Sequence, residues 1–315
     1  MKNKVTIIGA GSVGAATAYS LLARDAASEV VLIDINAEKA LGEALDIKQA
    51  LPFLDNGDIY AGDYRDAVGS QYVIITSGMG RKPGQTRLEL VQTNIEIIRS
   101  ISSQIVKYAP DAMYILVANP VDILTYAFLQ FTGLPKHQVM GTGTLLDTIR
   151  LRTRLAEIYG VSKKQVHANV LGEHGDSSFV AWSTATISGV PLEEYTQSIA
   201  TNYTLNTEYT HEDVENYVKK SGGKIISRKG CTVYGVATSS MHIVKSISGN
   251  AGNIMTVSTL HDGEYGIKDV CLSSLSLVNE GGVQSIITQK LSDDEMRNLY
   301  NSANVLKEIL KSSGF

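Results

Sequence analysis

Two short stretches of the chain, residues 146–150 and 172–176, hold an arginine, a histidine and carboxylates suited to acid–base chemistry. Asp147 and Arg150 are three residues apart, so on a helix they share one face. The forked guanidinium of Arg150 can hold a carboxylate with two parallel hydrogen bonds, which a lysine cannot do. His174 is the natural acid and base, because the ordinary pKa of histidine lies near working pH. Asp147 would orient its imidazole and stabilise its cation. Together the three side chains predict chemistry on a 2-keto or 2-hydroxy acid.

A glycine-rich turn follows the first predicted strand and opens the first predicted helix; it consists of Gly9, Ala10, Gly11, Ser12, Val13 and Gly14. Its first two glycines permit a tight turn and a close approach to a pyrophosphate, and the third lets helix and strand pack closely. The helix N-terminus then favours the anion. Asp34 ends the second predicted strand, where a carboxylate accepts hydrogen bonds from ribose hydroxyls and repels a 2′-phosphate. The turn therefore predicts NAD rather than NADP as a cofactor, and the chemistry becomes hydride transfer.

A glycine-rich stretch, residues 78–87, follows a predicted strand and precedes a predicted helix, as a mobile lid would. Arg87 at its far end could swing over the reacting carbonyl and stabilise developing negative charge. Gly78 at its near end is expected to contact the cofactor. Asn119 follows another strand, where ligand-facing groups are expected in such a sheet. A solvated basic loop is the alternative for the lid stretch.

Alternating strand and helix patterns must position these side chains in the first part of the chain. Continuous apolar runs predict buried parallel strands at residues 5–8, 30–33, 72–75 and 113–117. Amphipathic stretches predict helices at residues 14–24, 37–51 and 88–108. This alternation indicates an α/β fold, a doubly wound parallel (Rossmann) sheet with right-handed crossovers. We expect residues 1–143 to form the NAD-binding domain.

The pattern changes in residues 144–315, which we expect to form a catalytic, substrate-binding α+β domain. It opens with a predicted helix at residues 145–159. Strands are predicted at residues 166–171, 253–260 and 270–278, and further helices near residues 212–226, 232–246 and 293–311.

Composition excludes several functional classes. The chain has 315 residues, 43% of them hydrophobic, as is typical of a globular protein with a sizeable core. A formal net charge of -4 without a basic stripe argues against nucleic-acid binding. No apolar run approaches the ~20 residues of a membrane span, and no export signal opens the sequence, so we expect the cytoplasm. Cys231 and Cys271 lack metal-ligand or redox spacing, which predicts two reduced thiols in or near the core.

Four motifs, spread over essentially the whole chain, resemble the L-lactate/malate dehydrogenase family; they occupy residues 9–14, 119–122, 146–150 and 172–176. As a set these motifs are highly specific. The resemblance implies that His174 donates and accepts the proton, with Asp147 as its partner and Arg150 as the carboxylate anchor. It also implies that Arg87 is the mobile polarising arginine. Asn119 would lie near the reacting oxygen and the nicotinamide.

Most other motifs are similar to the lactate branch of that family: residues 141–144, Glu173, residues 231–235 with Thr232 expected at the substrate, and residues 269–273. One residue departs from it. The lid position facing the variable group of the substrate usually holds glutamine in the lactate branch and arginine in the malate branch; here it is Arg81. Closing Arg81 over a methyl group would desolvate an unpaired cation, whereas a second substrate carboxylate would pair with it. The framework favours pyruvate, and oxaloacetate or dual specificity is the alternative.

Arg152 and His167 match positions that bind fructose 1,6-bisphosphate, across a subunit interface, in allosteric bacterial members of the family. Arg152 is two residues beyond Arg150 and would point away from the catalytic face of its helix. His167 is an odd number of residues before His174, which would put the two histidines on opposite faces of an extended segment. Polar surface or interface residues without an effector are the alternative. The resemblance also implies a homotetramer or a homodimer.

Two further classes of protein compete with an enzyme of this family. A non-catalytic NAD-binding protein that kept the fold would be free to lose Arg87, Asp147, Arg150 and His174, and all four are present. A glycosidase of this fold would need a metal-ligand pattern, which the sequence does not contain, so no metal site is predicted.

Overall fold

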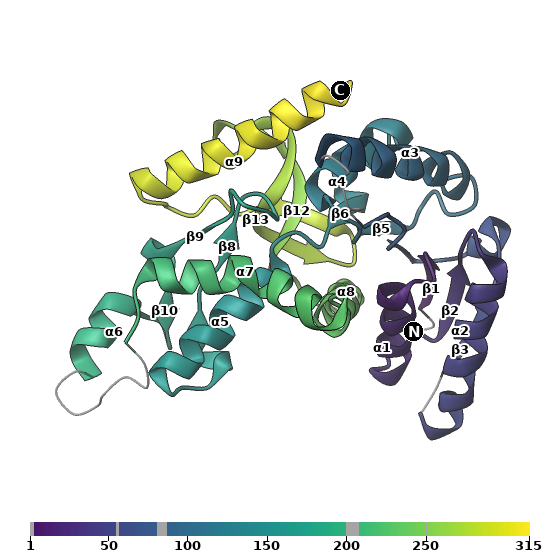
Figure 1. The fold of residues 1–315 in the computed structure, drawn as a ribbon, viewed down its shortest axis with the longest axis horizontal. Coiled ribbons are helices and arrows are strands. Elements are labelled where there is room, and N and C mark those ends of the chain that lie inside the picture. Colours follow the sequence, from purple (N-terminus) through teal and green to yellow (C-terminus); the bar gives the residue numbers. More distant parts are fainter. Residues whose placement is uncertain (1–2, 55–56, 81–86, 200–207, 250) are drawn as a thin grey trace.

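A twisted nine-stranded sheet runs through the part of the chain that the structure describes, and helices cover both of its faces (Figure 1). The structure is a computed structural model that describes residues 3–54, 57–80, 87–199, 208–249 and 251–315, except for the side chain of Arg87. The predicted doubly wound sheet is confirmed.

Strands alternate with helices in the first part of the chain. The strands are β1 (Lys4–Ile8), β2 (Glu29–Ile33), β3 (Asp58–Ala61), β4 (Tyr72–Ile75), β5 (Met113–Leu116) and β6 (Val139–Gly141). The α-helices between them are α1 (Ser12–Ala23), α2 (Ala37–Ala50), α3 (Arg87–Ile105) and α4 (Val121–Thr132). Short 3-10 helices lie at η1 (Leu51–Phe53), η2 (Tyr64–Ala67) and η3 (Lys136–Gln138).

The second part of the chain mixes helices with mostly antiparallel strands. The helices are α5 (Leu145–Tyr159), α6 (Leu192–Ile199), α7 (His211–Lys229), α8 (Tyr234–Ile247) and α9 (Asp293–Ser312), with short η4 (Lys163–Gln165), η5 (Trp182–Thr184) and η6 (Glu264–Gly266). Short strands are β7 (Val166–His167), β8 (Val170–Leu171), β9 (Phe179–Val180), β10 (Thr186–Ile187) and β11 (Val190–Pro191). Three further strands, β12 (Asn253–Asp262), β13 (Lys268–Asn279) and β14 (Gly282–Ile286), join the large sheet.

The order of strands in the large sheet places the ligand-binding edge. Strands β3, β2, β1, β4, β5 and β6 lie side by side and pair in parallel. Chain order reverses between β1 and β4, and ligands bind beyond the carboxyl ends of the strands at such a point. On the other side β12 joins β6 antiparallel through Ser258 and Gly141. The sheet thus continues across the predicted domain boundary at residues 143 and 144, and that division stays a prediction.

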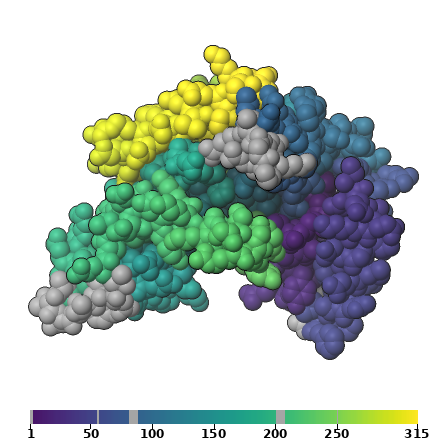
Figure 2. Space-filling model, in the orientation of Figure 1, coloured from purple at the N-terminus to yellow at the C-terminus, as the bar shows by residue number. Residues whose placement is uncertain are grey.

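Two apolar cores sandwich the sheet. Alternate strand residues face opposite sides, so Ile75 and Leu116 pack with α3, α4 and α9, whereas Ile74 and Ile115 pack with α1, α2 and α8. Helix α8, from the second part of the chain, therefore lies against α1 from the first part (Figures 1 and 2). A third, smaller core holds α5, α6 and α7 together.

Two predictions from the sequence need correction. Residues 166–171 do not form one strand. Two residues separate β7 from β8, and the two strands belong to different small sheets. Cys271 is buried as expected, but Cys231 is exposed in the loop between α7 and α8. The sequence pattern also missed α4 and α6 and several strands, none longer than five residues: β3, β6, β9, β10, β11 and β14.

Candidate active site

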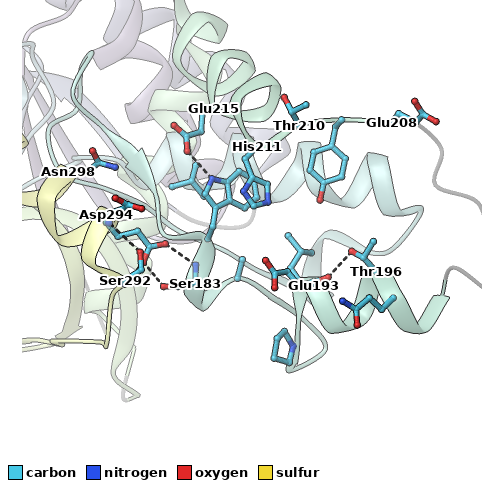
Figure 3. A pocket seen from close by; sticks show the side chains of 18 residues that line it. Ser183, Glu193, Thr196, Glu208, Thr210, His211, Glu215, Ser292, Asp294 and Asn298 are labelled. Atoms are coloured by element: carbon cyan, nitrogen blue, oxygen red, sulfur yellow. Dashed lines mark hydrogen bonds between the residues drawn. The ribbon is translucent and has the colours of Figure 1, made fainter.

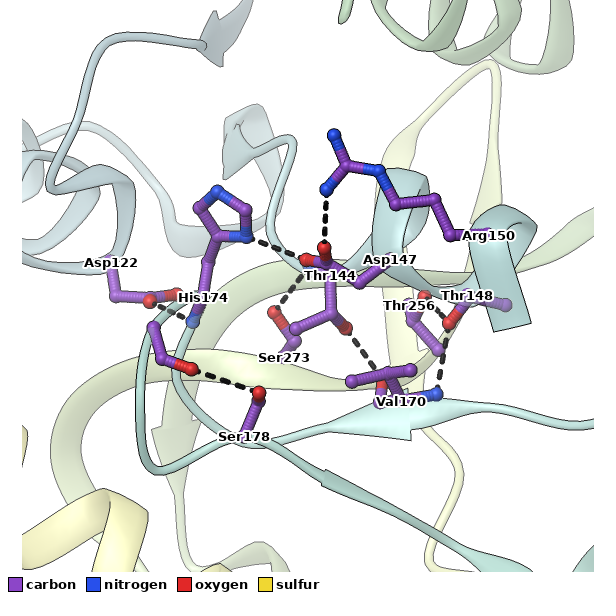
Figure 4. Close-up of polar contacts among 11 residues, drawn as sticks. Asp122, Thr144, Asp147, Thr148, Arg150, Val170, His174, Ser178, Thr256 and Ser273 are labelled. Carbon is purple, nitrogen blue, oxygen red and sulfur yellow. Dashed lines mark hydrogen bonds and ion pairs between the residues drawn. The ribbon is translucent and has the colours of Figure 1, made fainter. Parts of the chain in front are cut away.

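Buried hydrogen bonds hold the first two turns of helix α5 against its neighbours (Figure 4). Thr144 Oγ1 donates to the Val170 carbonyl at 2.5 Å, and the Thr144 N–H donates to Ser273 Oγ at 3.0 Å. One turn further on, Thr148 Oγ1 accepts from the Val170 N–H at 3.0 Å. Both threonines are buried. The backbone around Asp147 is therefore fixed to β8 and β13.

Asp147, Arg150 and His174 meet in one cluster (Figure 4). His174 Nδ1 lies 2.6 Å from Asp147 Oδ2, and Arg150 Nη1 donates to Asp147 Oδ1 at 2.9 Å. The Asp147 side chain is 10% exposed, against 28% for His174. The second ring nitrogen of His174 points away from Asp147. His174 can therefore exchange a proton with a ligand while Asp147 stays covered.

The charges in this cluster keep His174 ready to donate a proton. Burial by itself would lower the pKa of His174, but the hydrogen bond and charge of Asp147 outweigh it and raise that pKa. Burial by itself would raise the pKa of Asp147, but His174 and Arg150 lower it overall. Asp147 is thus an ionised partner that stabilises the imidazolium form of His174.

A second carboxylate, Asp122, supports His174 from the other side and received no role from the sequence. It lies in the first turn of α4, three residues after Asn119, and is 2% exposed. Its Oδ2 accepts the backbone N–H of His174 at 2.7 Å. Burial raises the pKa of Asp122 to about 6. Residues 119–122 form one of the motifs that resemble the family, but only the tertiary contact shows that Asp122 holds the backbone of His174.

We expect Asp122→Asn to change how stability depends on pH. The pKa of Asp122, about 6 in the folded protein, lies above its ordinary value of 3.8, so folding favours the protonated form. This stabilisation is complete below the ordinary pKa and is lost as the pH rises through the folded pKa. Relative to Asp122→Asn, the wild type should lose about 2 kcal/mol of unfolding free energy between about pH 4 and pH 7. Urea denaturation at several pH values measures the unfolding free energies, and Asp111→Asn is the control because Asp111 is exposed. A difference between wild type and Asp122→Asn that does not vary with pH would contradict the prediction.

The glycine-rich turn leaves room for a ligand at one glycine and needs the other two for packing. A Cβ on Gly14 would lie 1.8 Å from the Gly9 carbonyl oxygen, and Gly9 itself has a φ of +112°. A Cβ on Gly11 would meet no protein atom within 4 Å. Helix α1 begins at Ser12 without a side-chain cap or an acidic residue in its first turn. The N–H groups from Ser12 to Gly14 therefore suit the pyrophosphate of a dinucleotide.

The end of strand β2 is tied to this turn through Asp34. Its Oδ2 accepts the Ala10 N–H at 2.6 Å, and its Oδ1 accepts the Asn36 N–H at 2.8 Å. From the end of β4, Thr76 Oγ1 donates to the Gly9 carbonyl at 2.9 Å. An ionised carboxylate has about four acceptor sites. Asp34 could therefore hold the turn and accept hydrogen bonds from ribose hydroxyls at once.

The remaining predicted cofactor and substrate residues lie at the same edge of the sheet where the structure describes them. Gly78 and Asn119 follow β4 and β5, and a Cβ on Gly78 would lie 2.9 Å from Ala118 Cβ. Arg81 and the rest of the lid stretch to residue 86 lie outside the described residues. So does the side chain of Arg87, whose backbone begins α3.

Thr232 lies in the loop before α8 and is half-buried. Three residues further on, Gly235 at the start of α8 lies against Leu146, the residue before Asp147: a Cβ added to Gly235 would be 3.1 Å from Leu146 Cδ1. The start of α8, which follows the Thr232 loop, therefore lies beside helix α5.

Arg152 lies on another side of α5 and contacts the β7–β8 link. Its Nε donates to the Ala168 carbonyl at 2.9 Å, and its Nη2 donates to Asn169 Oδ1 at 2.9 Å. His167, next along the chain, is exposed. The face argument for His167 and His174 was wrong, because the chain between them is not one extended segment: β7 ends at His167 and Gly172 has a φ of +90°.

A separate hollow of about 1190 Å³ is lined by residues of η5, α6, α7 and α9 (Figure 3). In it the rings of Trp182 and His211 stack with centroids 3.8 Å apart, and Trp182 Nε1 donates to Glu215 Oε1 at 2.8 Å. None of the site residues predicted from the sequence lines it, so it takes no part in the site described above.

The described residues contain neither a candidate metal site nor a candidate membrane-spanning helix. No group of three or more His, Cys, Asp or Glu side chains in these residues is placed to hold a metal ion. None of the helices in this part of the chain is long and apolar enough to cross a membrane.

Fold and cluster together indicate a dinucleotide-dependent oxidoreductase. Comparison with known families agrees: residues 3–141 match the NAD binding domain of lactate/malate dehydrogenase, and residues 144–314 match the alpha/beta C-terminal domain of the same family. The chain belongs to the lactate/malate dehydrogenase family. It is an NAD-dependent dehydrogenase.

Individual relatives match over almost the whole chain. An L-lactate dehydrogenase of Acetivibrio thermocellus is 44% identical over 98% of this chain and 96% of its own length. L-lactate dehydrogenase 1 of Clostridium acetobutylicum is 42% identical over 98% of each chain. Among solved structures, the minor L-lactate dehydrogenase of Enterococcus mundtii has a TM-score of 0.94 at 39% identity, covering 99% of this chain and 98% of its own.

Proposed function

We propose that this chain is an L-lactate dehydrogenase that interconverts pyruvate and L-lactate with NAD. The observation that carries the proposal is the cluster in which Asp147 contacts both His174 and Arg150. It combines a proton donor with a carboxylate anchor, which a 2-keto acid requires. The names of the relatives support the same substrate pair.

In the direction of pyruvate reduction, Arg150 binds the substrate carboxylate through guanidinium N–H groups that Asp147 leaves free. His174 then delivers its proton to the keto oxygen, and Asp147 stabilises the imidazolium until that transfer. Asn119 and Thr232 would contact the substrate from the loops that follow β5 and precede α8. Arg87 would polarise the carbonyl and stabilise the charge that develops on its oxygen. In lactate oxidation His174 accepts the proton instead.

The residues at the carboxyl ends of β1, β2 and β4 fit NAD. Gly9, Gly11 and Gly14, with Ser12 and Val13, would hold the pyrophosphate, because the open space beside Gly11 meets the N-terminus of α1. Asp34 would bind the adenosine ribose, and Gly78 and Asn119 would lie toward the nicotinamide. When bound, NAD supplies the carrier for the hydride that the substrate carbon gains or loses.

Substrate preference is the first property to measure. Purified protein should oxidise NADH with a higher kcat/KM for pyruvate than for oxaloacetate, since the relatives favour the lactate branch. In that case Arg81, which is typical of the malate branch, does not control the choice. A higher kcat/KM for oxaloacetate would contradict the proposal and make Arg81 the specificity residue.

Alanine at two glycines should separate cofactor binding from folding. Gly11→Ala should leave the melting temperature unchanged but weaken NADH binding by about tenfold or more, because the new methyl group takes the space of the pyrophosphate. Gly14→Ala should lower stability, because its methyl group meets the Gly9 carbonyl. NADH fluorescence titration and thermal melts test both variants. Unchanged NADH affinity in Gly11→Ala would count against this pyrophosphate site.

Regulation and assembly complete the proposal. Arg152 and His167 would bind fructose 1,6-bisphosphate at an interface of a homotetramer, with a homodimer as the alternative. Support comes from their closeness, since Arg152 contacts the residue after His167. Measuring the KM for pyruvate with and without the bisphosphate tests the effector site, and an unchanged KM would contradict it. Light scattering measures the mass of the assembly. The cytoplasm stays the expected location.

A further inference from the structure

We propose that Asn94, on helix α3, is a positioning residue for the reaction. Its side chain holds Met79 and Asn119, which follow two neighbouring strands at the active-site edge, in one fixed arrangement. The inference rests on the proposed function, because that function places Asn119 at the reacting oxygen. The sequence gives no hint of this role, since Asn94 is one polar residue within an amphipathic helix.

The side-chain amide of Asn94 is fully used by the backbone of two loops. Its Oδ1 accepts the Met79 N–H at 2.8 Å, and its Nδ2 donates to the Met79 carbonyl at 3.2 Å. The same Nδ2 donates to the Asn119 carbonyl at 2.8 Å. Asn94 is 1% exposed, so water cannot easily replace these bonds. A primary amide has two donor hydrogens and one acceptor oxygen, and here each has a partner.

These bonds begin where the sheet stops joining the two loops. Strands β4 and β5 pair up to Ile75 and Leu116, and the Val117 N–H still donates to the Ile75 carbonyl at 2.9 Å. Beyond that point the two segments are no longer paired as strands. The Asn94 amide then bonds both backbone groups of Met79, as the peptide of a neighbouring strand would. Helix α3 thereby links the ends of β4 and β5.

The role requires an amide at position 94. Leucine would make none of the three bonds, and the carbonyls of Met79 and Asn119 would lose their donor. An ionised aspartate would place a carboxylate oxygen against the carbonyl oxygens of Met79 and Asn119, which repel it. A protonated aspartate would keep one donor for them. Either change frees the Asn119 peptide to shift, and a displacement of about 1 Å near the reacting atoms can cost about 100-fold in rate.

Kinetics of Asn94→Leu and Asn94→Asp test the inference. We expect kcat for pyruvate to fall about 100-fold in Asn94→Leu, while NADH affinity stays within about threefold because other bonds hold the glycine turn. In Asn94→Asp the kcat relative to wild type should rise as the pH is lowered, because a protonated carboxyl regains one donor. Asn94→Leu should show no such recovery. A residue that only stabilises the fold would not produce this difference in pH profile.

The control for lost stability is Ile98→Val, one turn further along α3 and fully buried, which weakens the same helix and keeps the three hydrogen bonds of Asn94. If Asn94→Leu does not fold, the smaller Asn94→Ser takes its place. A kcat within about threefold of wild type in both Asn94 variants would overturn the inference. So would an equal loss of kcat in Ile98→Val. A wild type inactive on pyruvate and oxaloacetate would instead contradict the proposed function.

Discussion

Replacing His174 by asparagine should lower kcat/KM for pyruvate by about 10³-fold or more, at the upper end of what general acid–base catalysis contributes. Asparagine cannot deliver a proton to the keto oxygen, and it removes one of the two cations that pair with the Asp147 carboxylate, leaving only Arg150. NADH affinity should be unchanged, because the glycine turn joins β1 to α1 whereas His174 lies in the loop after β8. Steady-state kinetics and NADH fluorescence titration on one preparation measure the two effects separately.

The matched control is His137→Asn, since His137 is exposed in η3 and has no contact with the cluster. It should keep wild-type kinetics. The assignment of His174 as proton donor would be wrong if His174→Asn retained kcat/KM within about tenfold of wild type, because solvent would then serve as well as the imidazole.

Arg150→Lys should lower kcat/KM for pyruvate by about 100-fold, mainly through a higher KM. Lysine keeps the positive charge but loses the planar fork, and one charge-assisted hydrogen bond is worth about 1.5–3 kcal/mol. The guanidinium of Arg150 donates to Asp147 Oδ1 at 2.9 Å and still has N–H groups for the substrate carboxylate. The single ammonium group of lysine cannot reach both partners in this geometry. Initial rates over a range of pyruvate concentrations measure KM and kcat.

Helix α5 supplies its own control, because Arg154 lies one turn beyond Arg150 but pairs with Glu157 at 3.6 Å and packs over the Tyr217 ring of α7. Arg154→Lys should keep kcat/KM within about twofold. Acetaldehyde, which lacks a carboxylate, gives a second test. Wild type and Arg150→Lys should reduce it equally slowly, and a large difference between them would show that Arg150 acts on more than the substrate carboxylate.

Local pattern was sufficient for much of the fold. Strand β4 and helix α5 have the bounds expected from the sequence. All residues of β4 are buried and form one continuous apolar run, and α5 buries a face with helical spacing. The failures have a local cause as well. β6 is three residues long, too short for a periodic signal, and its place between β5 and β12 depends on pairing with segments far away in the chain.

Residue types and spacing also determined the chemistry. Gly9, Gly11 and Gly14 between a strand and a helix predict a phosphate turn, because the constraint is local backbone geometry. Asp147 and Arg150 had to share a helix face, and the structure joins them by an ion pair. These features follow from the neighbours of each residue along the chain, which is the information that a sequence carries directly.

Only the tertiary structure decided which distant groups support the chemistry. Asp122 meets His174, and Asn94 meets both Met79 and Asn119, through contacts between residues that are remote in sequence. Burial gives these contacts their importance, because a covered carboxylate or amide must find its partners within the protein. No periodic pattern marks such a residue beforehand. The sequence by itself therefore determined the fold class and predicted the reacting groups, and the packing of distant loops decided what holds those groups in place.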